Sequence, residues 1–223
     1  MNRKRIITAV LMAILSLLVM TYIERIVQPG YWIKSLVKLF MFGGSILLYA
    51  FVFKEEVPEL IHLKKKRPSK KLILFMAFAY AGIIVLYLLL SRYIDLDSIR
   101  DNLMKKEHLS RQNFLFIFSY IILINSFLEE SFFRGFLYQV FKEQKLEKTG
   151  ILFSALVFAL YHISIMDGWF HPIIMLLGIS GLFLVGIFLQ IIMKREDNLL
   201  GSWLVHAFAN LAINTIATIM LFS

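Results

Sequence analysis

The chain contains no cysteine among its 223 residues. Disulfide bonds, thiolate metal sites, cysteine nucleophiles and S-palmitoylation are therefore excluded. Charged residues are also scarce, at 17% of the chain, and there are only 4 prolines. Apolar residues make up 59% of the chain, compared with about 45–50% in soluble domains. This composition excludes a disordered chain and an ordinary soluble domain, and it indicates an integral membrane protein.

Seven apolar stretches are long enough to cross a bilayer as helices. We predict spans at residues 6–27, 31–53, 72–94, 113–141, 150–166, 170–193 and 199–222. The predicted fold class is all-α, a polytopic transmembrane helical bundle of about seven spans with an intramembrane polar cavity. The loop 95–111 alternates acidic and basic residues, and we expect a short surface helix there.

The basic residues outnumber the acidic ones, with 24 Lys and Arg against 15 Asp and Glu. In a soluble protein this excess would point to nucleic acid, but in so apolar a chain we expect contact with membrane lipids and no nucleic acid. With a cytoplasmic N-terminus, 15 basic residues fall in inner segments and 8 in outer ones. This bias predicts a cytoplasmic N-terminus and an external C-terminus. We expect the membrane to be a bacterial cell membrane.

Polar residues inside the predicted spans are the main functional signal. A charged side chain at that depth costs several kcal/mol unless it is paired or faces water, so each one marks a candidate site. Three of the spans contain such residues, together with polar neighbours: Asn125, Glu129, Glu130 and Arg134 in the fourth, His162 in the fifth, and His206, Asn210 and Asn214 in the seventh. In the other spans we expect charges only at the edges, where long side chains reach the interface.

Helical spacing suggests how these residues cooperate. Glu130 and Arg134 are four residues apart on one face, and this spacing predicts an ion pair. The pairing leaves Glu129 as a free carboxyl group that is suited to act as a general base. His206 and Asn210 are also four apart and are expected to point into the same space. Two further asparagines, Asn125 and Asn214, are predicted to form hydrogen bonds between helices.

The sequence resembles the CAAX-protease and bacteriocin-processing family of intramembrane proteases, also called the Abi family. The pattern of that family is EExxxR, then FxxxH, then HxxxN, each on its own helix. Here residues 129–135 are EESFFRG, residues 158–162 are FALYH, and residues 206–210 are HAFAN, with Gly201 and Ser202 ahead of the third element. Each element alone is a weak signal, but three in order on three apolar helices are specific.

The resemblance covers about residues 113–222. It divides the chain into N-terminal transmembrane helices, residues 1–112, and a catalytic helical core, residues 113–223. The sixth span resembles the glycine-rich helix of the family, in which small residues let helices approach closely. Its glycines are Gly178, Gly181 and Gly186.

The resemblance implies an endopeptidase that works without a covalent intermediate. Glu129 would be the general base that activates a water molecule, and His162 would hold that water. His206 and Asn210 would donate hydrogen bonds to the oxyanion of the tetrahedral intermediate. Two residues of the first motif would support the site structurally: Glu130 and Arg134.

A metal-dependent alternative stays open. Glu129, His162 and His206 form a set of two histidines and one glutamate, which is typical of catalytic zinc. However, the chain has no HExxH helix, and Asn210 suits an oxyanion hole better than a zinc site. We therefore favour a site that requires no cofactor, with a divalent metal such as zinc as the alternative.

The expected substrate is a membrane-associated or hydrophobic peptide or protein. The resemblance implies processing of a bacterial peptide pheromone or bacteriocin, or self-immunity against one. The alternative is a non-catalytic membrane protein, either an immunity factor or a transporter-associated protein. In that case the Glu and His cluster would serve as a proton relay.

Overall fold

The structure, a computed structural model, describes residues 2–105, 107–166 and 172–222, and these residues form helices and connecting loops with no strand. Seven of the described helices are long and apolar enough to cross a membrane. They comprise Arg3–Val27, Tyr31–Phe53, Leu72–Tyr93, Phe114–Glu143, Glu147–Ile165, Pro172–Glu196 and Leu199–Phe222. All seven predicted spans are confirmed, although residues 170 and 171 of the sixth lie outside the described residues. The all-α fold class is likewise confirmed.

Several spans consist of successive helical segments. The first is α1 (Arg3–Tyr22) with η1 (Ile23–Val27), the second is α2 (Tyr31–Lys38), η2 (Leu39–Gly43) and α3 (Gly44–Phe53), and the third is α5 (Leu72–Leu90) with η3 (Ser91–Tyr93). The fourth is α7 (Phe114–Tyr120), η4 (Ile121–Asn125), α8 (Ser126–Glu130), η5 (Ser131–Leu137) and α9 (Tyr138–Glu143). The last three are α10 (Glu147–Ile165), α11 (Pro172–Glu196) and α12 (Leu199–Phe222). Two short helices lie between spans, α4 (Val57–Leu60) and α6 (Leu96–Lys105), and α6 confirms the predicted surface helix.

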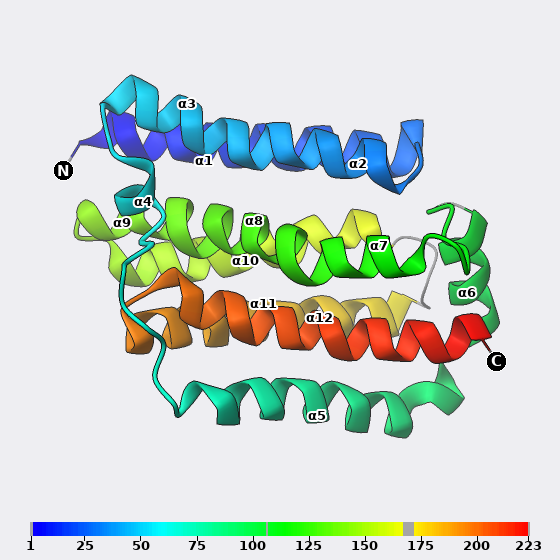
Figure 1. Ribbon diagram of the computed structural model, residues 1–223. Helices are drawn as coiled ribbons and strands as arrows, with labels where there is room; N and C mark the ends of the chain where they lie inside the picture. The colour runs from blue at the N-terminus through cyan, green and yellow to red at the C-terminus, as the bar shows by residue number, and fades with distance from the viewer. Residues whose placement is uncertain (1, 106, 167–171, 223) are drawn as a thin grey trace.

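The helices are arranged so that those carrying the motifs lie in the middle of the bundle (Figure 1). The fourth span and α10 form a central layer, with α11 and α12 beside it. The hairpin of the first two spans covers one side, where α1 contacts α10 and η2 contacts α8. The third span, α5, packs on α12 at the opposite side. The two termini lie at opposite ends of the bundle, as an odd number of spans requires.

Aromatic side chains fill the core between the hairpin and the central layer. Phe42 of η2 stacks on Phe132 of η5 with ring centroids 4.4 Å apart, and it meets Tyr161 of α10 edge-on at 5.3 Å. Phe133 in turn contacts Phe158 of α10 at 5.4 Å. Because burying each aromatic ring removes a large apolar area, this cluster fixes three spans against one another.

The loop between the second and third spans is fastened to the corner between α11 and α12. His62 Nε2 lies 2.9 Å from Asp197 Oδ1, and the Gln139 amide lies 2.8 Å from the other ring nitrogen. Lys64 also binds Asp197, at 2.7 Å, and Asn198 donates to the Lys64 carbonyl. Hydrogen bonds from Lys64 and His62 lower the pKa of Asp197 to about 2, whereas burial lowers the pKa of His62. Asp197 is therefore charged and His62 neutral at pH 7, which suits a ring that accepts from one neighbour and donates to the other.

Close helix contact at the glycines of the sixth span is confirmed at one position. A Cβ added at Gly186 would lie 3.0 Å from the Ala155 backbone of α10, so the small residue does allow close approach there. Among the described residues, a Cβ at Gly178 would meet only the end of a methionine side chain, 4.0 Å away, and a Cβ at Gly181 would meet no atom within 4 Å. The prediction was therefore wrong for Gly181, which faces open space.

A tighter contact occurs at the glycine that follows the first motif. A Cβ on Gly135 would lie 2.8 Å from the Ile61 Cα and 2.9 Å from the Ile61 carbonyl oxygen. Both are backbone atoms, which cannot move aside as the end of a side chain can. Gly135 therefore allows the loop after α4 to pack directly on η5.

We expect Gly135→Ala to lower the free energy of unfolding by about 1–3 kcal/mol, because the methyl group forces the Ile61 backbone away. Thermal unfolding in detergent measures the effect. Gly181→Ala is the matched control, since its added methyl group meets nothing, and we expect no loss of stability. Equal unfolding temperatures for the two variants would contradict the role of Gly135.

Candidate active site

The two adjacent carboxylates of the first motif lie near the middle of the fourth span. Glu129 and Glu130 end α8, between the π-helical segments η4 and η5, and they are only 2% and 0% exposed. Single π-helical turns inside α-helices are frequent at functional sites, because they change the direction in which side chains point. The sequence did not predict them here. At this position the structure shows a buried polar cluster, and an open cavity around it stays a prediction.

Glu130 is held by two partners. Arg134 Nη1 lies 3.3 Å from Glu130 Oε1, which confirms the predicted ion pair. His206 of α12 places its Nδ1 2.9 Å from the same oxygen. The Arg134 guanidinium also lies 3.9 Å from the centroid of the Phe158 ring, a cation–π contact. Glu130 and Arg134 thus connect the fourth span with α10 and α12.

Glu129 is also paired, and the prediction that it is a free carboxyl was wrong. Lys38, the last residue of α2, places its Nζ 3.1 Å from Glu129 Oε1 and 2.6 Å from Asn125 Oδ1. The Asn125 amide donates to Glu129 Oε1 as well, at 3.0 Å. Asn125 therefore links two spans through Lys38, which confirms its predicted role between helices.

The expectation that the spans without motif residues carry charges only at their edges was wrong for the second span. Lys38 is 8% exposed, and Lys34, one turn earlier on α2, is 6% exposed. Lys34 pairs with Glu24 at 2.8 Å and with Glu107 at 2.6 Å. The spacing of four residues between two lysines in an apolar stretch was the available signal, since it places both on one helical face. Their carboxylate partners lie far away in sequence, so only the folded structure identifies them.

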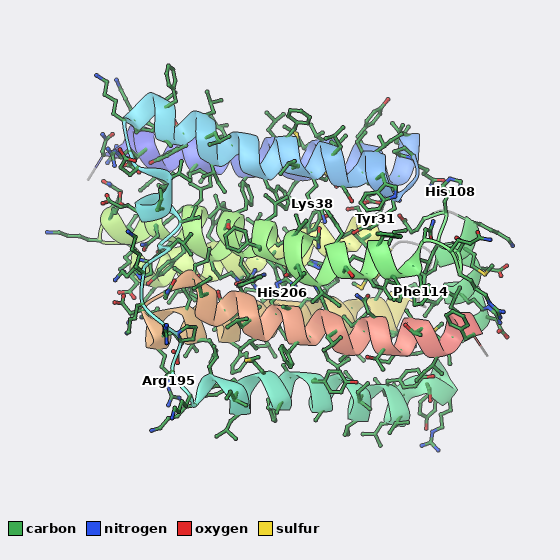
Figure 2. All side chains as sticks on the ribbon, viewed as in Figure 1. Tyr31, Lys38, His108, Phe114, Arg195 and His206 are labelled. Atoms are coloured by element: carbon green, nitrogen blue, oxygen red, sulfur yellow. The ribbon has the colours of Figure 1, made fainter. Side chains whose placement is uncertain are left out.

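His206 lies between the two carboxylates. Figure 2 shows it in the interior of the bundle, where α12 faces the central layer. Its Nδ1 faces Glu130, and its Nε2 lies 3.8 Å from Glu129 Oε2. The distance to Glu129 is too long for a hydrogen bond. An ionised carboxylate accepts hydrogen bonds only, so Nδ1 carries the hydrogen that points to Glu130.

His162 reaches the same region from α10. Its Nδ1 bonds the Phe158 carbonyl at 2.8 Å, so the second ring nitrogen is the one left for other contacts. Its ring packs edge-on against Phe158, which also contacts His206. The imidazole lies within electrostatic range of Glu129 and Lys38.

Three polar side chains of α12 lie on one face, as predicted from their spacing, and contact the fourth span: His206, Asn210 and Asn214. Asn210 donates to the Ile121 carbonyl at 3.2 Å and Asn214 to the Phe118 carbonyl at 3.2 Å. Each of these carbonyls also accepts a backbone N–H of the fourth span, so the asparagine amides add a second hydrogen bond to carbonyls at and just before η4. Asn214 thus has its predicted role between helices. Asn210 lies on the expected face, but its amide is bonded to backbone and not to the carboxylates.

The charges in the cluster balance. Lys38 neutralises Glu129 and Arg134 neutralises Glu130, so four buried charged groups sum to zero when the imidazoles are neutral. A balanced cluster is far less costly in a membrane than any one of its members alone. The site can therefore hold two carboxylates without protonating either.

The metal set of Glu129, His162 and His206 stays a prediction. Among the residues that the structure describes, no three His, Asp or Glu side chains are grouped so as to hold a metal ion. The positive charge beside Glu129 is the Lys38 ammonium group.

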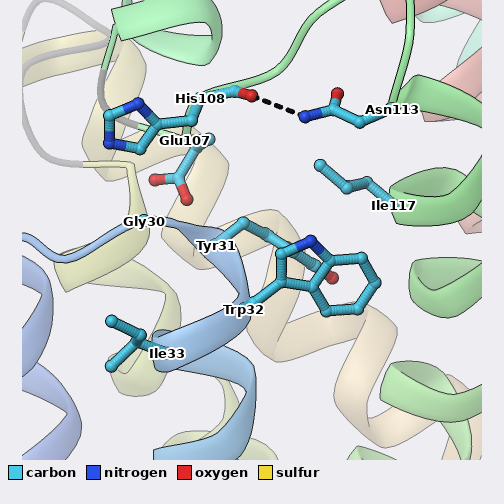
Figure 3. A pocket seen from close by; sticks show the side chains of 8 residues that line it. All are labelled: Gly30, Tyr31, Trp32, Ile33, Glu107, His108, Asn113 and Ile117. Atoms are coloured by element: carbon cyan, nitrogen blue, oxygen red, sulfur yellow. Dashed lines mark hydrogen bonds between the residues drawn. The ribbon is translucent and has the colours of Figure 1, made fainter.

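A separate pocket of about 240 Å³ lies at the N-terminal end of α2 (Figure 3). Its lining includes Tyr31, Trp32 and Glu107, and His108 accepts a hydrogen bond from Asn113 at its rim. None of the motif residues lines it. The pocket is therefore distinct from the carboxylate cluster.

Comparison with known proteins adds one match. Residues 111–212 match a protein-family model described as type II CAAX prenyl endopeptidase Rce1-like. The matched segment contains all three motifs, and Lys38 lies outside it. No curated protein and no solved structure matches the chain.

We expect Arg134→Met to destabilise the protein by about 3–5 kcal/mol, because it leaves Glu130 buried without its cation. Thermal unfolding and the level of protein in membranes measure this loss. The exposed pair Lys105–Asp101, also four residues apart on a helix, is the matched control. Lys105→Met should leave stability almost unchanged, because water solvates both groups. Similar losses in the two variants would contradict the structural role of Arg134.

Proposed function

Because residues 111–212 belong to the Rce1-like family of type II CAAX prenyl endopeptidases, we propose that this chain hydrolyses a peptide bond within the membrane, using water activated by Glu129. Family membership supports the general activity, an intramembrane protease. The finer assignment is supported by one observation above all. Glu129 Oε1 accepts from both Lys38 and Asn125, whereas Oε2 faces His206, so one oxygen is held and the other is left to react.

In the proposed reaction, Glu129 Oε2 takes a proton from a water molecule, and the hydroxide attacks the scissile carbonyl carbon. His162 orients the water. The tetrahedral intermediate then collapses, the carbon–nitrogen bond breaks, and the proton held by Glu129 passes to the leaving amine. Glu129 regains its ionised form, so the cycle consumes one water and needs no other reactant.

The oxyanion of the intermediate requires hydrogen-bond donors. We assign this role to His206 and Asn210. With Nδ1 donating to Glu130, donation from His206 Nε2 requires the doubly protonated ring, whose charge the Glu130 carboxylate stabilises. An amide nitrogen carries two hydrogens, so Asn210 keeps one donor beyond its bond to Ile121.

We propose a hydrophobic or membrane-associated peptide as the substrate, in bacterial peptide processing or self-immunity. The proposed orientation has a cytoplasmic N-terminus and an external C-terminus. Residues 113–223 form the proposed catalytic core. The proposed reaction needs no metal, because the Lys38 ammonium group supplies the positive charge beside Glu129.

We expect Glu129→Gln to lower kcat by about 10²–10⁴-fold, because the amide cannot accept the proton. The substitution keeps the volume of the side chain and leaves Lys38 two oxygen acceptors, so the protein should still insert and purify. Cleavage is measured with two quenched peptides, a hydrophobic one without lipid and one ending in a farnesylated CaaX sequence. Glu143→Gln, at the exposed end of the same span, is the control and should cleave normally. Full activity of Glu129→Gln would exclude the mechanism, and no cleavage by the unaltered protein would favour the non-catalytic alternative.

Because the proposed site uses no metal, we expect the active protein to contain zinc at less than about a tenth of its molar amount and to keep its activity after treatment with strong chelators. A three-ligand zinc site would instead lose its metal and its activity together. Elemental analysis of the purified protein and an assay before and after chelation measure this. Stoichiometric zinc with activity that follows its occupancy would overturn the proposal of a metal-independent site.

A further inference from the structure

We propose that Lys38 is a positioning residue of the active site, which holds one oxygen of Glu129 so that the other accepts the proton from water. The proposal rests on the proposed function. It adds to the site a residue from the second span, outside residues 111–212 that match the family model. The hairpin of the first two spans would then complete the site and not merely anchor it.

The geometry is that of a clamp on one carboxylate oxygen. Lys38 Nζ binds Asn125 Oδ1 at 2.6 Å and Glu129 Oε1 at 3.1 Å, and the Asn125 amide binds the same Glu129 oxygen at 3.0 Å. The three side chains therefore form a closed triangle of hydrogen bonds. Oε1 has two donors, and rotation of the carboxylate would break both bonds. The clamp thus selects Oε2, the oxygen that faces His206, as the reactive atom.

The positive charge of Lys38 serves the same end. In the apolar interior of the bundle, an ammonium group beside Glu129 keeps it in the carboxylate form, which is the form that accepts a proton. The ammonium also lies 5.0 Å from the centroid of the Tyr161 ring. Tyr161 precedes His162 on α10. Lys38 therefore contacts the proposed base, Glu129, and the residue next to His162, which would orient the water. One side chain from α2 therefore fixes the base relative to α10.

Lys34 is a matched control for Lys38. It lies on the same face of α2 one turn earlier, is equally buried, and also pairs with carboxylates. Its partners are Glu24 and Glu107, however, and not Glu129. Removing Lys34 leaves two partly exposed carboxylates without their cation, whereas removing Lys38 releases the proposed base.

The first experiment measures kcat and KM of the full chain with whichever of the two quenched peptides it cleaves. We expect Lys38→Met to lower kcat by about a hundredfold, the effect of misplacing a reacting group by about 1 Å, with little change in KM. Lys38→Arg should recover part of the rate, because its guanidinium reaches both oxygen acceptors. Lys34→Met should keep the kcat of the unaltered protein per folded molecule, even if it unfolds at a lower temperature.

The second experiment needs no substrate. Thermal unfolding temperatures of Lys38→Met, Glu129→Gln and the double variant form a cycle, and contact between the two groups predicts that the double variant loses less than the sum. Additive losses, or wild-type kcat in Lys38→Met, would overturn the proposal while leaving the proposed function intact. An unaltered protein that cleaves neither peptide would overturn the proposed function, and a positioning role for Lys38 with it.

Discussion

Two adjacent carboxylates buried at the middle of a membrane span impose the constraint on which this structure depends. Glu129 and Glu130 are almost fully buried, and a membrane interior offers no bulk solvent to stabilise their charges. Each must therefore find its own cation at close range. Adjacent residues on a helix point in directions about 100° apart, and here the two carboxylates pair with cations from two different spans.

The two cations come from two different spans, and this explains part of the helix packing. Arg134 belongs to the same span and pairs with Glu130 one turn away, so that half of the cluster is local. Lys38 comes from the second span and can reach Glu129 only if α2 and η2 pack closely on α8. The stacked rings of Phe42 and Phe132 hold the two spans at that distance. Apolar packing and charge pairing thus support the same arrangement.

Much of this was predictable because it follows from local periodicity. Seven apolar stretches of sufficient length gave the seven spans, and the spacing of four residues gave both the ion pair of Glu130 with Arg134 and the shared face of His206 and Asn210. These depend on neighbours within a turn or two of helix. The prediction failed for Glu129, whose partner Lys38 is 91 residues away. Lys34 and Lys38 share a helical face, but this spacing is the same whether two lysines near the end of an apolar stretch reach the interface or turn inward.

The π-helical segments were equally beyond reach, although they shape the site. They flank α8 on both sides, and Asn210 and Asn214 bind backbone carbonyls in η4 and just before it. The same two asparagines therefore fasten α12 to the fourth span, while His206, on the same face, reaches the carboxylates. By contrast, α5 buries only Leu72 within its length and sends no charged group toward the cluster. The two flanks of the central layer are thus unlike. The hairpin side contributes a charge that the buried carboxylates require, and the α5 side contributes mainly apolar contact with α12.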